Sequence, residues 1–103
     1  MGVAIRERFV DGMPVLVMES DCLVVEVAAG VGGRITRIVE KRTGRDLLWR
    51  NATLPLTRAA AGSAYDANFY GGIDEVIPND APEVICGVAS PDHGELWTTA
   101  LIP

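Results

Sequence analysis

The chain has 103 residues, of which 49% are hydrophobic and 22% charged. This is the composition of one folded domain, and it excludes a disordered or low-complexity protein. Its formal net charge of −5 argues against a nucleic-acid partner, because such surfaces are usually basic. No apolar run approaches the roughly 20 residues of a membrane helix, and charged residues among the first ten exclude a signal peptide. We therefore expect one cytoplasmic domain over residues 1–103.

Apolar and polar residues alternate with a period of two along much of the chain, which is typical of half-buried β-strands. Asp11-Gly12 predicts a tight hairpin turn, because glycine accepts the positive φ that such turns require. Pro14 indicates that the following strand lies at an edge, the glycines at 30–33 indicate a turn, and residues 50–72 read as a loop. The expected strands are, in chain order, residues 3–10, 13–19, 22–28, 34–40, 46–49, 83–89 and 95–102.

Short strands separated by turn signals, without a helical stripe, predict an all-β fold, an antiparallel β-sandwich or part of one. The last expected strand, residues 95–102, is strongly apolar and requires neighbours, because an open apolar edge invites aggregation. Either this strand pairs inward, or the chain is the N-terminal part of a longer sandwich. In the second case we expect the isolated chain to fold poorly or to self-associate through an exposed strand edge.

The basic residues are unevenly distributed, since seven of the nine lie within residues 34–58 and none within 59–103. Eight of the nine are arginines, which favour planar, forked hydrogen bonding. Two interpretations stay open: a solvated turn at residues 41–45, or a contact to an anion or sugar phosphate. Cys22 and Cys86 have no metal-type spacing, and we expect both to be small buried hydrophobes.

Asp74 and Glu75 are adjacent carboxylates in a stretch that follows two glycines. In an extended strand neighbouring side chains point to opposite faces, so these two would not form an acid/base pair. A loop hinged at Gly71-Gly72 could bring them together. The other interpretation is a solvated acidic loop.

His93 is the only histidine, so any histidine chemistry of this chain must use it. If a regular strand starts there, Glu95 and Trp97 share its face. An imidazole, a carboxylate and an indole on one face would suit a polyol, with hydrogen bonds at the rim and an aromatic platform beneath. A catalytic zinc normally needs three protein ligands, so no metal is expected. The alternative is a structural turn histidine.

Three segments together resemble a known family. Residues 32–49 contain a Gly-Gly-Arg strand and a Thr-Gly turn, residues 69–78 contain Gly-Gly, an acidic pair and Pro, and residues 92–97 contain Asp-His-Gly-Glu-Leu-Trp. In this order they resemble aldose 1-epimerase (galactose mutarotase)-like proteins. The resemblance implies a β-sandwich that is part of a galactose mutarotase-like supersandwich, whose concave sheet binds a monosaccharide or sugar phosphate.

The resemblance also implies an isomerase that acts at an anomeric carbon by general acid/base catalysis, without metal or other cofactor. In the family a second histidine is the acid and a late glutamate the base. This chain has one histidine and no acidic residue after Glu95, so we expect the catalytic pair beyond residue 103 and keep His93 as the one candidate here. The expected substrate-binding residues are Asp74, Glu75, Asn79, His93, Glu95 and Trp97.

Two other functions stay open. One is a non-catalytic carbohydrate-binding or accessory sandwich, and the other is a small structural β-domain without a sugar site. A further histidine and a late glutamate on the same concave face would favour the enzyme.

Overall fold

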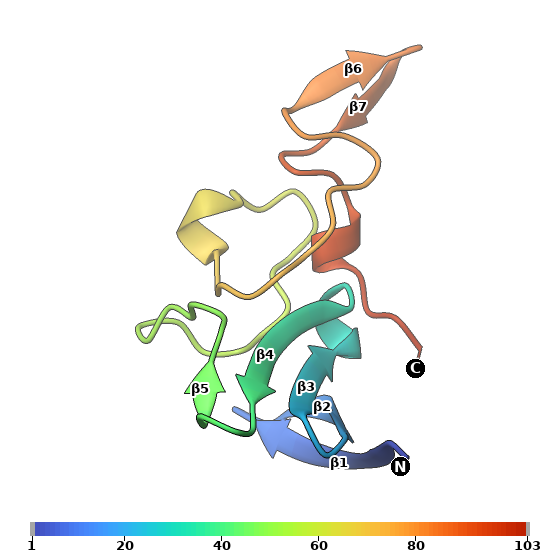
Figure 1. Cartoon of the computed structure of the whole chain (residues 1–103). Helices are drawn as coiled ribbons and strands as arrows, with labels where there is room; N and C mark the ends of the chain where they lie inside the picture. The colour runs from blue at the N-terminus through green and yellow to red at the C-terminus, as the bar shows by residue number, and fades with distance from the viewer. Residues whose placement is uncertain (1, 103) are drawn as a thin grey trace.

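A computed structural model describes residues 2–102 (Figure 1). The chain is all-β, with a five-stranded and a two-stranded antiparallel sheet and three short 3-10 turns, which confirms the predicted fold class. Among these residues no helix is long and apolar enough to cross a membrane. The strands are β1 (Ala4–Val10), β2 (Met13–Glu19), β3 (Leu23–Ala28), β4 (Arg34–Glu40), β5 (Arg45–Asp46), β6 (Glu83–Ile85) and β7 (Val88–Ser90).

The five strands of the larger sheet follow chain order, β1 to β5. Asp11 and Gly12 have φ angles of 52° and 77°, as the predicted tight turn requires. The prediction that Pro14 marks an edge strand is wrong, because β2 lies between β1 and β3. However, β3 pairs with β2 only from Leu16 onward, so the missing N–H of Pro14 interrupts no bond to β3.

One face of the large sheet is covered by the loop that follows β5. Leu56 from this loop is 1% exposed, and its backbone N–H donates to Asp11 Oδ2 at 2.8 Å, which fixes the loop against the β1–β2 turn. The core on this inner face consists of Val15, Ala28, Val31 and Leu56. The outer face is open, and β1 leaves Ile5 and Phe9 each 63% exposed.

Residues 83–89 are a hairpin and not the single strand that the sequence predicts. Cys86 and Gly87 have φ angles of 51° and 77°, so they form a two-residue turn between β6 and β7. This hairpin extends from one end of the molecule (Figure 1), and the radius of gyration, 15.1 Å, exceeds the roughly 13 Å of a compact chain of this size. Cys22 and Cys86 are both exposed, which contradicts their predicted burial.

The predicted strand over residues 95–102 is also wrong. Leu96–Thr98 forms a 3-10 turn, η3, and the chain then runs along the β3–β4 connection. The N–H of Gly32 donates to the Thr99 carbonyl at 2.7 Å, and the N–H of Leu101 donates to the Ala29 carbonyl at 2.8 Å. The segment therefore presents no open strand edge. Of the predicted strand over 46–49, only Asp46 lies in a strand, as the second of the two residues of β5.

Glycines form the closest main-chain contacts of the loop region, one with the sheet and one within the loops. A Cβ on Gly72 would collide with the Ile35 carbonyl, and a Cβ on Gly94 would collide with the Ile77 carbonyl. Both glycines also have positive φ angles, of 75° and 76°. Residue 72 therefore needs glycine for two reasons: its backbone conformation and the lack of space.

Gly44 offers a matched control for Gly72, because its φ is 70° and nothing lies within 4 Å of its Cβ position. We expect Gly44→Ala to cost about 1–2 kcal/mol, for the left-handed conformation alone. Gly72→Ala should cost about 1–3 kcal/mol more, because the added methyl also displaces the Ile35 carbonyl. Urea unfolding of the two variants and the parent measures the difference. Equal losses would contradict the close packing at residue 72.

Candidate functional site

The candidate site is anchored on Arg34, the first residue of β4, whose side chain is 2% exposed. Its guanidinium donates from Nη1 to the Gly71 carbonyl at 2.5 Å and from Nη2 to Asp74 Oδ2 at 2.6 Å. It also lies over the Phe69 ring, 5.6 Å from the centroid. One buried cation thus holds three points of the loop against the sheet.

Tyr65 connects this ion pair to the histidine. Its hydroxyl donates to Asp74, with distances of 2.8 and 3.0 Å to the two carboxylate oxygens. Burial, and then the hydrogen bond and the negative charge of Asp74, raise the pKa of Tyr65 to about 12. The phenol therefore stays protonated at neutral pH and acts as a donor.

His93 stacks on Tyr65 with ring centroids 3.7 Å apart and an interplanar angle of 4°. Its Nδ1 lies 2.8 Å from Asp92 Oδ1, and its Nε2 lies 3.6 Å from Asp80 Oδ1. The hydrogen bond to Asp92 raises the pKa of His93 above its usual value; partial burial opposes this, and the charges of Asp92 and Asp80 add to it. The side chain is 27% exposed, so a fixed imidazole edge faces solvent.

The predicted shared face of His93, Glu95 and Trp97 is wrong in its geometry. His93 has a φ of 58° and Glu95 is in the helical region, so no regular strand starts here. Trp97 does meet His93 through Tyr65, since its ring lies edge-on to the Tyr65 ring at 5.2 Å. However, Trp97 is 4% exposed and its Nε1 donates to the Asp92 carbonyl at 3.0 Å, so it is a core residue. Glu95 is exposed, apart from this cluster.

The adjacent carboxylates Asp74 and Glu75 differ in environment. Asp74 is half-buried between Arg34 and Tyr65, whereas Glu75 is exposed. Asn79 is buried, and its Nδ2 donates to the carbonyls of Ala81 and Pro91, both at 2.8 Å. The structure thus uses Asp74 and Asn79 to hold the loop, and Glu75 contributes to neither contact.

Sequence reasoning missed Arg34 and three aromatic residues of the site, Tyr65, Phe69 and Trp49. Trp49, three residues after β5, is 63% exposed and stacks on Phe69 with ring centroids 5.8 Å apart. Phe69 in turn lies 5.5 Å from Tyr65, so an aromatic row leads from Trp49 to His93. The signal that could have found Trp49 is a tryptophan placed where a strand pattern gives way to a long loop.

Within residues 2–102, no three His, Cys, Asp or Glu side chains group as metal ligands. The arrangement can instead donate and accept hydrogen bonds at one imidazole edge, and the exposed Trp49 indole lies at the other end of the aromatic row. No protein-family model, curated protein or solved structure matches the chain significantly.

The titration of His93 tests the geometry of the site. We expect its pKa to lie above the usual value of about 6.5 and to fall toward that value in Asp92→Asn, which removes the neighbouring charge. The pKa of His93 is raised in the folded state. The interaction with Asp92 therefore stabilises the fold at pH values below the usual pKa, and this stabilisation is lost as the pH rises through the raised pKa. Proton NMR of the single imidazole measures both variants, with Asp21→Asn in the β2–β3 turn as control. An unchanged pKa in Asp92→Asn would contradict the contact.

Proposed function

We propose that the chain binds a monosaccharide or sugar phosphate and forms the N-terminal part of an aldose 1-epimerase-like protein. The observation that carries this proposal is the His93 imidazole, which is stacked on Tyr65, hydrogen-bonded to Asp92 and open to solvent along one edge. A fixed imidazole loses little freedom when it accepts or donates a hydrogen bond to a hydroxyl. The resemblance of residues 92–97 to the sugar-facing segment of the family supports the same role.

Trp49 supplies the second element of the proposed site. Sugars present polarised C–H groups on one face of the ring, and an aromatic ring has a negative face and a large apolar area. Trp49 is exposed and backed by Phe69, which holds its plane. A sugar could then rest on the indole while its hydroxyls meet polar groups further along the aromatic row.

The reaction proposed for the longer parent is ring opening and closing at the anomeric carbon. It needs a base at the anomeric hydroxyl and an acid at the ring oxygen. This chain has one histidine, and Glu75 and Glu95 are exposed, apart from the His93 cluster. This favours binding, and not catalysis, by residues 1–103 themselves. A non-catalytic carbohydrate-binding sandwich is the second candidate function, and the same observation supports it. A cytoplasmic location belongs to this proposal and agrees with two exposed free cysteines.

Calorimetry with a panel of hexoses and hexose phosphates tests the binding proposal. We expect His93→Gln to weaken binding about 5- to 150-fold, because it displaces the aligned hydrogen-bonding atom. Trp49→Ala should also weaken binding, whereas Leu47→Ala, which truncates another exposed apolar residue of the same segment, should not. If every variant folds and no hexose affinity changes, the histidine is structural and the sugar site is disproved.

Polarimetry on freshly dissolved glucose or galactose tests the assignment of catalysis. We expect the 103-residue chain to leave the rate at the buffer value, since it lacks the second histidine and the late carboxylate. An acceleration that disappears in His93→Ala would show instead that this chain holds a complete catalytic site.

A further inference from the structure

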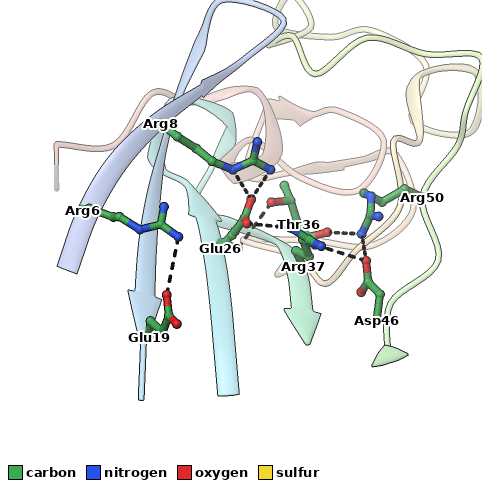
Figure 2. A network of polar contacts seen from close by, with 8 residues as sticks. All are labelled: Arg6, Arg8, Glu19, Glu26, Thr36, Arg37, Asp46 and Arg50. Atoms are coloured by element: carbon green, nitrogen blue, oxygen red, sulfur yellow. Dashed lines mark hydrogen bonds and ion pairs between the residues drawn. The ribbon is translucent and has the colours of Figure 1, made fainter. Parts of the chain in front are cut away.

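A second polar site lies on the inner face of the large sheet, apart from His93. Glu26 of β3 is 2% exposed, although its strand neighbours are apolar. Arg8 of β1 donates to Glu26 Oε1 from Nε at 2.9 Å and from Nη2 at 2.6 Å, and Arg37 of β4 donates to Oε2 at 3.3 Å (Figure 2). A buried carboxylate is thus held between two arginines from strands on either side of it.

A cavity of about 170 Å³ opens beside this carboxylate, with room for about five water molecules. Three guanidinium groups line it, those of Arg8, Arg37 and Arg50, with Glu26 as the single carboxylate in the wall. Leu56 and Tyr70 contribute the apolar part of the wall. The three arginine side chains are 42%, 41% and 35% exposed, so a small solute can reach them.

The protein's own acceptors leave one of these donors without a hydrogen bond. Arg37 Nε is buried without a hydrogen-bond partner among residues 2–102, and Asp46 Oδ2 lies 3.7 Å from it, beyond hydrogen-bond distance. Arg50 donates to Asp46 and, at 3.2 Å, to the Thr36 carbonyl (Figure 2). Three arginines face two carboxylates, so one positive charge is in excess. Because the three guanidinium side chains are also partly exposed, an anion in the cavity would find charged N–H donors there and would compensate the excess charge.

We propose that this cavity binds a phosphate group. Guanidinium groups match the geometry of tetrahedral oxyanions through paired N–H donors, and converging arginines are the usual recognition element for phosphate. The wall combines arginine donors with the apolar side chains of Val10 and Leu56 and the ring of Tyr70, which suits a phosphate monoester that carries an apolar or neutral group. This site does not depend on the proposed sugar site, since it shares none of that site's residues.

The test uses inorganic phosphate as probe, at low ionic strength because salt screens the interaction. We expect saturable binding by the whole chain, followed by calorimetry or phosphorus NMR. Arg50→Gln should weaken it about tenfold or more, through loss of a charge-assisted bond. Arg42→Gln, at an arginine that is 86% exposed and paired with Glu40, is the matched control and should bind as the parent does.

Glu26→Gln should change the phosphate affinity in the opposite direction, so the proposal can still be tested if an arginine variant fails to fold. It removes the competing negative charge and retains an acceptor for Arg8, so phosphate should bind several-fold more tightly. No saturable binding by the parent, or binding equal in the Arg50, Arg42 and Glu26 variants, would overturn the proposal. Glucose 6-phosphate then distinguishes the sources: tighter binding than inorganic phosphate identifies a sugar phosphate, and equal binding identifies the free ion.

Discussion

The buried ion pair between Arg34 and Asp74 is the interaction on which the candidate site depends. It joins the first residue of β4 to a loop 40 positions further along the chain. A buried guanidinium that loses its carboxylate becomes an uncompensated charge. Removing one partner therefore destabilises the fold far more than replacing both residues together. Because Tyr65 donates to the same carboxylate and supports His93, the position of the imidazole follows from the position of this cation.

The inner face of the sheet combines a small apolar core with two polar clusters. Only a few side chains are both apolar and fully buried, while Glu26, Arg34 and Thr36 are buried with them. A small core contributes limited hydrophobic stabilisation, so the hydrogen-bonded clusters have a large share in specifying how the loop lies on the sheet. The loop also makes its tightest contacts at glycine residues, where main chain packs directly against main chain.

The sheet could be predicted from the sequence and the site largely could not, for physical reasons. Strands β1 to β4 follow from alternation and from Asp11-Gly12, because both are local signals. The sequence does not predict the hairpin at 83–89, because Cys86 adopts a positive φ, which non-glycine residues rarely do. The 95–102 segment has the apolar composition of a strand but bonds to the β3–β4 connection. The sequence points to Asp74, but its contacts with Arg34 and Tyr65 join residues that are distant along the chain, so no local pattern predicts them.

The glycine contacts have a consequence for how this surface can vary. Gly72 and Gly94 dock main chain on main chain, and the bonds between residues 35 and 73 are also main-chain bonds. Attachment therefore depends on these main-chain contacts and on the buried Arg34–Asp74 pair, and scarcely on the exposed side chains between them. Exposed positions such as Trp49 and Glu75 can be exchanged while the frame persists. Such a scaffold can acquire a new ligand preference by a few surface replacements, without refolding the domain that displays them.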